Sequence, residues 1–412
     1  QREFDFFQAQ QNKGVWEAPD FLPFSAFVGR LYEDALHSER PSALPMLLTG
    51  VQEQWLWKQA IANSRWEKEL LSIDQAADQC RDAWRVAKAW RIRLGQGNED
   101  AQAFGAWSAK YEESTRGEVD AARLPDLVAS LLKDLKKPKL LVAYAFDILP
   151  PQTREFLDAC AASGIEVLES KPERRAARAG RTSFNSSKNE LEAAASWART
   201  RLEENRCPSP IFPRIGVVVP GLQQRRKEVA RIFSRVMQPG FNLPGQAKAP
   251  MPFNISIGEP LSRYPVVALA LAVLEFAHGE IPFEEASRLI RSPFIGGAES
   301  ELAARARLDA RLRRKLDATL RLPKLIGHID GCPDLRERLE KVFEYLKANF
   351  SESQSPSAWA RHFSALLEAA GFPGERALDS AEFQARAKWH EALAELSGLE
   401  RLSQRISFSQ AI

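Results

Sequence analysis

The stretch that decides the fold is "KLLVAYAFDILPPQTREFLDACAASGIEVLE", residues 139–169. It opens with a continuous apolar run that lies between Pro138 and Asp147, which is typical of a strand buried on both faces of a sheet. Residues 151–164 have helical spacing and end in a glycine, and residues 165–169 predict a second strand. A strand, a helix and a strand in such close succession predict an α/β unit with parallel strands.

A second α/β unit is predicted further along the chain. Residues 182–205 predict a short strand and a helix, and "RIGVVVP" at 214–220 predicts a buried strand that leads into a helix at 221–237. The segment between the two units, 171–181, is polar and basic without apolar periodicity, so we interpret it as a linker.

Helical patterns occupy most of the remaining chain. We therefore expect an α/β protein that is divided into several parts. These parts are a first α/β domain at 1–172 with a helical insertion at about 52–136, part of a second α/β domain at 181–261, a helical insertion domain at 262–401, and a truncated return segment toward the second α/β domain at 402–412.

Composition narrows the class of protein. A chain of 412 residues is long enough for two or three domains, and its net charge of +3 permits nucleic-acid binding without requiring it. The longest predominantly apolar run, 264–277, is shorter than the roughly 20 residues that span a bilayer. The chain does not open with a secretory leader, and its four cysteines have no CxxC spacing. We expect a cytoplasmic protein with reduced cysteines and no membrane association.

The sequence lacks the motifs that mark several kinds of catalytic site. The chain has no GxxxxGK[ST], GxGxxG or GxSxG motif. "PDLVASLLKDLK" at 125–136 imitates a nuclease motif, but Asp126 and Asp134 are separated by about 12 Å of helix axis and do not converge on one metal ion. We predict no catalytic residue, metal site or cofactor in this chain.

Four stretches, in this order, carry a resemblance to a known family. They read "WEAPDFLPFSAFVGRLY" (16–32), "AYAFDILPPQTREFLDA" (143–159), "RIGVVVPGLQQRRKEVARIF" (214–233) with "FNISIGEPLSRYPVVALALAVLEFA" (253–277), and "LIRSPFIGG" (289–297) with "SAWARHFSALLEAAGFPGE" (357–375). They resemble superfamily 1 helicases of the UvrD type. They are more similar to the inactivated relatives of these helicases, the AddB- and RecC-like subunits of helicase–exonuclease complexes and bacterial "probable DNA repair" proteins. The resemblance implies two RecA-like parallel-sheet domains, each with a helical insertion.

The same resemblance implies that ATP hydrolysis has been lost. Active members carry a D-E-x-Q-D motif before P-x-Q, and matching the latter to Pro150 and Gln152 puts Ala143 and Tyr144 in place of the two acids that handle metal and water. Neither side chain can hold Mg²⁺. Asp147 falls on the later acid of the motif, and we interpret it as an acid that caps the following helix. Arg226 matches an arginine that reaches the γ-phosphate, and is either a relic of that nucleotide contact or a surface cation.

Two basic stretches are candidates for nucleic-acid binding. Arg307, Arg311, Arg314 and Lys315 recur at helical spacing, so they predict one cationic face that tracks phosphates; the alternative is a solvated face paired with acids such as Glu299 and Glu301. The second stretch interleaves cations with tryptophans, which suits single-strand binding by stacking and charge, although the tryptophans could instead form the core of a helical insertion. Its members are Arg81, Trp84, Arg85, Lys88 and Trp90.

The resemblance, together with the two basic stretches, therefore implies a DNA-binding, ATPase-inactive helicase-like region of a repair or recombination exonuclease. It would hold a DNA end or single strand and position it for a nuclease domain outside this chain. Two alternatives stay open. One is an active helicase that uses ATP and Mg²⁺ through a P-loop upstream of Gln1, and the other is a scaffold for a partner helicase subunit.

Overall fold

The computed structural model describes residues 20–38, 44–62, 64–171, 179–204, 215–243, 251–349 and 351–412. The protein is mostly helical, with 60% helix and 7% strand, so it is α/β only in a loose sense. The chain divides into two compact units. Unit 1 comprises Gln1–Arg174, Asn349–Ala365 and His390–Ile412, and unit 2 comprises Arg175–Ala348 and Leu366–Trp389.

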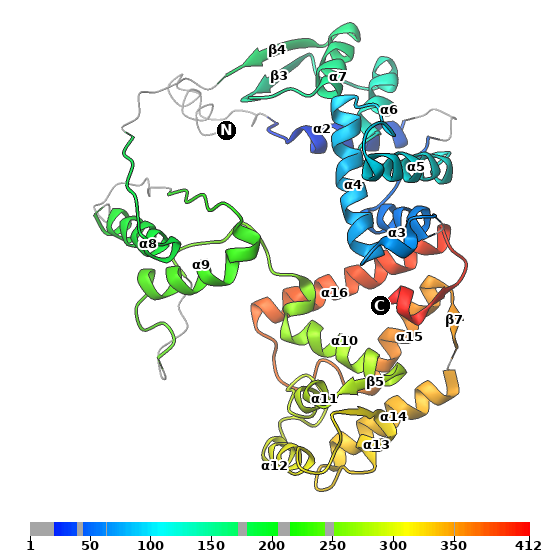
Figure 1. The fold of residues 1–412 in the computed structure, drawn as a ribbon, viewed down its shortest axis with the longest axis vertical. Helices are drawn as coiled ribbons and strands as arrows, with labels where there is room; N and C mark the ends of the chain where they lie inside the picture. The colour runs from blue at the N-terminus through cyan, green and yellow to red at the C-terminus, as the bar shows by residue number, and fades with distance from the viewer. Residues whose placement is uncertain are drawn as a thin grey trace. The chain divides into compact units, whose positions relative to one another are not determined.

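Unit 1 contains the predicted strand, helix and strand. β3 (Leu140–Tyr144) and β4 (Glu166–Ser170) pair in parallel, and α7 (Pro151–Ala162) connects them (Figure 1). Gly164 ends this connection at a φ of 95°, a backbone conformation that glycine adopts without strain. The sequence prediction of an α/β unit with parallel strands is therefore confirmed at this position.

The prediction that the first strand is buried on both faces is wrong. Leu140, Val142 and Tyr144 are each 45–48% exposed, whereas Ala143 between them is buried. Because alternate residues point to opposite faces, α7 covers one face of the two-stranded sheet and no described residue buries the other. An apolar run predicts where a strand forms, but whether one or both faces of that strand are buried depends on elements that are distant in the sequence.

The core behind β3 and β4 is formed by three helices. α2 (Phe24–Leu36) and α6 (Leu124–Leu131) pack together with α7, and Phe156 of α7 makes edge-to-face contacts with Phe24 and Phe27. Between α2 and α6 in the chain lies a short parallel pair, β1 (Met46–Leu47) with β2 (Glu118–Val119).

A second helical cluster of unit 1 confirms the helical pattern predicted within 52–136. α3 (Gly50–Ala62), α4 (Ile73–Trp90) and α5 (Glu99–Ser114) enclose a group of buried aromatic rings from Trp57, Trp84 and Tyr111. The remaining elements of unit 1 are η1 (Glu67–Glu69), η2 (Leu132–Asp134), η4 (Leu399–Arg401), α17 (Phe408–Ala411) and the antiparallel pair β7 (Ser353–Gln354) and β8 (Ile406–Ser407). Two further helices have residues in both units, α15 (Pro356–Ala369) and α16 (Ser380–Gly398).

Unit 2 begins with two helices but lacks the strands predicted beside them. α8 (Ser187–Glu204) and α9 (Leu222–Met237) pack through Leu191, Ile232 and Phe233. Residues 182–186 and 215–219 form no strand, and Val218 is 93% exposed. A β-branched run becomes a strand only when a neighbour accepts its backbone hydrogen bonds, and no described segment does so here. Residue 214, where the second predicted strand begins, lies outside the described residues.

The larger part of unit 2 is helical, as predicted for most of 262–401. The apolar helix α10 (Pro265–His278) has nine of its 14 residues buried. The other elements are η3 (Leu261–Arg263), α11 (Phe283–Ile290), α12 (Leu302–Leu312), α13 (Leu322–Ile326), α14 (Pro333–Asn349) and the antiparallel pair β5 (Glu280–Pro282) and β6 (Thr319–Arg321). No helix in the described ranges of either unit has the length and apolar character that a membrane crossing requires.

Candidate nucleic-acid interface

Trp84, one of the two tryptophans predicted to stack on bases, lies in the core of unit 1. Its side chain is 1% exposed, and its ring lies 5.9 Å from that of Trp57 and 5.7 Å from that of Tyr111. Its indole Nε1 donates a hydrogen bond of 3.2 Å to Asp120. A ring enclosed in this way cannot also stack on a base. Of the two interpretations of Trp84, the structure therefore supports the one in which it forms part of a hydrophobic core.

Trp90, the other tryptophan, is exposed. It is the last residue of α4, and 46% of its surface is accessible. Its ring could stack on a base, but the three α4 cations predicted to accompany it are already paired with acids. Arg81 lies 3.1 Å from Asp78, Lys88 lies 2.7 Å from Glu112, and Arg85 lies 3.7 Å from both Glu53 and Asp82. α4 therefore presents little uncompensated positive charge to DNA.

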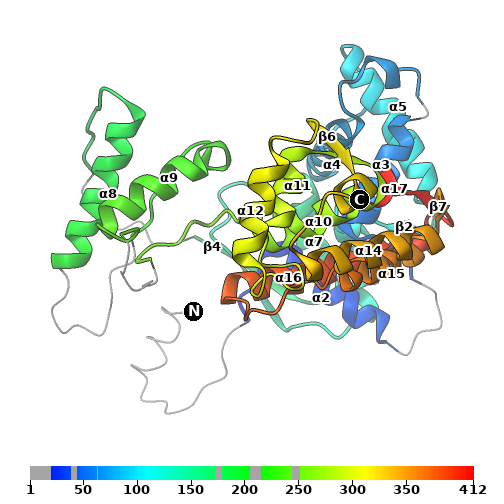
Figure 2. The same ribbon diagram turned by 90° about the horizontal axis from the view of Figure 1, so that it is seen from below.

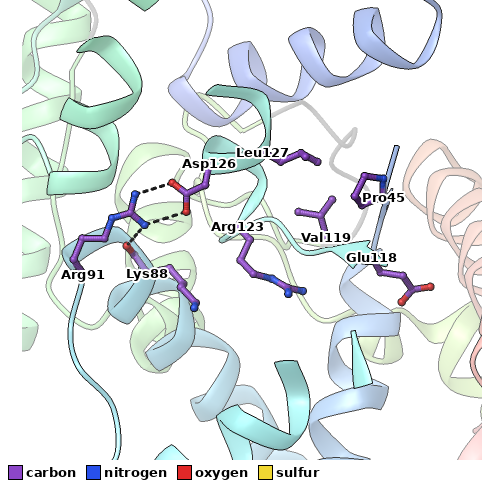
Figure 3. A pocket seen from close by; sticks show the side chains of 8 residues that line it. All are labelled: Pro45, Lys88, Arg91, Glu118, Val119, Arg123, Asp126 and Leu127. Atoms are coloured by element: carbon purple, nitrogen blue, oxygen red, sulfur yellow. Dashed lines mark hydrogen bonds and ion pairs between the residues drawn. The ribbon is translucent and has the colours of Figure 1, made fainter. Parts of the chain in front are cut away.

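A pocket of about 330 Å³ lies beside α4 in unit 1, and Figure 3 shows the eight side chains that line it. Arg91 is one of the three cations that line it. The Arg91 guanidinium donates to both carboxylate oxygens of Asp126, at 2.7 and 3.0 Å, and also contacts Glu155, and these bonds raise the pKa of Arg91 above its usual value. Arg123 of the lining bonds to Asp120. Because the cations of the pocket are matched by acids, the pocket offers no evident site for an anion.

Two buried acids near Trp84 escaped the sequence analysis. Asp120 is fully buried and accepts hydrogen bonds from Trp84, from the Tyr111 hydroxyl at 3.3 Å and from Arg123 Nε at 2.7 Å. Glu53 is 4% exposed and accepts from the Ala121 amide. Asp120 stands three residues before Arg123, a spacing that hints at a local ion pair, but the sequence holds no comparable sign for Glu53.

The environment of Glu53 predicts a dependence of stability on pH. Burial, with a smaller contribution from the Asp120 charge, raises the pKa of Glu53 above its ordinary value of 4.5, although the Ala121 amide, Arg85 and Arg81 oppose this. A raised folded-state pKa contributes stability that is fully present below the unfolded-state pKa and is lost as the pH rises through the folded-state pKa. Glu53→Gln should therefore be more stable than the wild type at neutral pH, and this advantage should shrink as the pH falls toward 4.5.

Thermal unfolding at a series of pH values measures this effect. Asp82→Asn is a matched control, because Asp82 contacts the same Arg85 but its side chain is 73% exposed. A stability difference between Glu53→Gln and the wild type that stays constant from pH 4.5 to 7.5 would contradict the assignment.

The second predicted cationic face lies at the end of α12 in unit 2. Arg307, Arg311, Arg314 and Lys315 are all exposed, but the expected single helix face is wrong, because α12 ends at Leu312 and the last two cations lie in the turn beyond it. Arg311 contacts Asp330 at 3.4 Å. The other three cations form no ion pair with any residue in the described ranges.

Of the two acids expected to neutralise this face, Glu299 forms no ion pair with its cations within the described residues, and Glu301 is occupied elsewhere. Glu301 is buried, and its carboxylate binds Arg305 Nε at 3.0 Å and the amides of Asp334 and Leu335 at 2.7 and 3.0 Å. Arg305, two residues before the first of the predicted cations, is itself 1% exposed. The alternative of a surface paired with Glu301 is therefore removed, and surplus positive charge remains at the end of α12.

Arg226, the possible relic of a nucleotide contact, has local partners in unit 2. Its Nε donates to the Ile257 carbonyl oxygen at 2.8 Å, and its Nη1 contacts the Glu259 carboxylate. These bonds join α9 to the segment that follows it. Asp147, interpreted as a cap, is exposed and does not cap α7, whose N-cap residue is Pro150.

The described part of the chain contains no group of three or more His, Cys, Asp or Glu side chains placed to bind a metal ion. Of the four cysteines, Cys80 and Cys160 are buried, which raises the pKa of their thiols to about 12 and about 11. Such thiols are protonated at neutral pH and are poor nucleophiles. Cys207 lies outside the described residues.

Comparison with known proteins adds no relative. No protein family matches the chain, and no curated protein is similar to it.

Proposed function

We propose that this chain is a DNA-binding, helicase-like region that does not hydrolyse ATP itself and that serves a repair or recombination nuclease. The observation that carries the proposal is the exposed, largely unpaired cationic surface formed by Arg307, Arg314 and Lys315 with Arg311 beside them. Such a surface attracts the phosphate backbone without regard to base sequence. It would hold a DNA end or a single strand for a nuclease domain outside this chain.

The loss of ATP hydrolysis is supported by the residues of β3. Ala143 and Tyr144 stand where the resembling helicases carry their metal-handling acids, and neither offers a carboxylate. The parallel pairing of β3 with β4 around α7 is the arrangement expected of part of a RecA-like domain. In this proposal α8 and α9 belong to a second such domain.

The proposal predicts salt-dependent DNA binding that depends on the end of α12. A labelled duplex with a single-stranded tail should bind the chain at low salt, and its affinity should fall steeply as salt rises. The charge reversals Arg307→Glu, Arg311→Glu and Arg314→Glu together should weaken binding by about tenfold or more at low salt, because each replaces an attraction to phosphate by a repulsion. Fluorescence anisotropy over a salt series measures both effects.

A charge-matched control separates this surface from net charge. Arg201→Glu, Lys341→Glu and Lys347→Glu together make the same change of charge on exposed positions of α8 and α14. Equal weakening by both triple variants would show that only net charge matters. ATP turnover by the longest native form of the protein would instead favour the active helicase.

A scaffold function is favoured by a different observation. Leu140, Val142, Tyr144 and Leu168 leave an apolar face of the β3–β4 sheet exposed, and parallel sheets are ordinarily covered on both faces. This face could receive a partner helicase subunit. Absence of DNA binding even at low salt would overturn the DNA-binding proposal and leave the scaffold as the better one.

A further inference from the structure

Two arginines from different elements of unit 2 converge on one buried aspartate. Arg291 follows α11 and Arg313 follows α12, and Figure 2 shows these two helices side by side. The Nε atoms of Arg291 and Arg313 lie 3.3 and 3.0 Å from the same Asp309 oxygen. Their Nη2 atoms both donate to the Ser287 hydroxyl, at 3.1 and 2.6 Å. The two guanidinium groups are thus held close together.

The charges of this cluster are unequal. Two guanidinium groups share a single carboxylate, so one positive charge is left over. Of the two acids of α11, Glu285 is engaged by Arg288 at 2.7 Å, and Glu284 is in no ion pair with a described residue. Asp309 is 5% exposed and Ser287 is fully buried, whereas the arginine side chains are 47% and 48% exposed. The anchoring groups are therefore inside the protein, and the surplus positive charge faces solvent.

The guanidinium groups keep donors available on their exposed sides. The hydrogen bonds of Arg291 and Arg313 use Nε and Nη2, and neither Nη1 bonds to any residue within the described ranges. Arg313 also lies over the Phe283 ring, 5.7 Å from its centre, which limits its freedom further. Planar cations that are fixed in place bind phosphate oxygens well, because little side-chain entropy is lost on binding.

We propose that Arg291 and Arg313 form a binding site for a phosphate group, oriented from behind by Asp309 and Ser287. The source of the phosphate rests on the proposed function, under which it is a phosphodiester of the DNA backbone. Neither arginine is one of the four residues that form the cationic surface at the end of α12, although Arg313 directly precedes Arg314 in the sequence. The site therefore adds a second, more rigid contact within unit 2.

The test uses a variant that removes the site without leaving a buried charge. Arg291→Gln, Asp309→Asn and Arg313→Gln together lower the net charge by one, and Arg201→Gln makes the same change on α8 as the control. Binding of a labelled 20-nucleotide oligothymidylate is measured by anisotropy over a salt series. We expect the triple variant to bind about fivefold or more weakly at low salt and to lower the salt slope by about one, with the control close to wild type.

A second probe, inorganic pyrophosphate, separates this inference from the proposed function. Suppose that pyrophosphate protects wild type, but not the triple variant, against thermal unfolding in a saturable way, and that neither protein binds the oligothymidylate. This result would support the phosphate site and overturn the DNA-binding function. If wild type and the triple variant both bind the oligothymidylate, and bind it equally well, the site is overturned and the function stands. If neither probe distinguishes the two proteins, the site is also overturned.

Discussion

Replacing Trp84 by alanine is expected to lower the stability of unit 1 by about 3–5 kcal/mol, the usual cost of deleting a buried tryptophan side chain. Trp84 is 1% exposed and packs edge-on against the stacked rings of Trp57 and Tyr111. Its removal would leave a cavity among aromatic rings and would take one hydrogen bond from the buried carboxylate of Asp120. Hydrogen exchange of the peptides from α3 and α5 measures the loss locally, without assuming that the two units unfold together.

Trp90→Ala is the matched control, because it removes the same side chain from the exposed end of the same helix. We expect it to cost less than about 1 kcal/mol. If Trp84 served stacking on bases instead of the core, Trp84→Ala would weaken DNA binding and leave exchange in α3 and α5 unchanged. That result would contradict the placement of Trp84.

The sequence was a good guide where the signal was local. The apolar run at 139–146, the prolines at 150 and 151, and Gly164 together locate β3, α7 and β4, because each of these features acts on its own neighbours. The end of α12 was not predictable in the same way. No glycine or proline follows Leu312 until Pro323, but Thr319–Arg321 pairs with β5 and the Ala318 carbonyl oxygen accepts from the Phe283 amide at 2.7 Å. A tertiary contact therefore overrides a helical pattern that continues in the sequence.

The candidate sites were less predictable than the helices, because charge partners are chosen in space. Arg305 and Arg307 look alike in sequence, but one is buried against Glu301 and the other is exposed. Arg291 and Arg313 are 22 positions apart, and nothing in their spacing indicates that they share Asp309. Counts of basic residues identified the correct region of unit 2 for surplus charge, but they could not assign the individual arginines.

The buried pair Glu301–Arg305 should produce the largest electrostatic effect on stability. Glu301 and Arg305 are 7% and 1% exposed at their side chains. Besides Arg305, Glu301 accepts hydrogen bonds from two amides at the start of α14, so Glu301→Ala would leave a buried guanidinium and two amides without this acceptor. We expect a loss of about 3–5 kcal/mol, the range found when one partner of a buried ion pair is removed. Urea unfolding, followed by hydrogen exchange in peptides of α12 and α14, measures it.

A double variant distinguishes the cost of the unpaired charge from the value of the pair. Adding Arg305→Met to Glu301→Ala removes the uncompensated cation while keeping an apolar stem, so part of the lost stability should return. Glu337→Ala, which breaks an exposed pair with Lys341 at the same four-residue spacing, should leave stability nearly unchanged. If the double variant is no more stable than Glu301→Ala, the loss comes from the uncapped α14 amides and not from the buried charge. The hydrogen bond from Arg305 to the Gly296 carbonyl oxygen, at 2.6 Å, would then be enough to stabilise the buried guanidinium after Glu301 is removed.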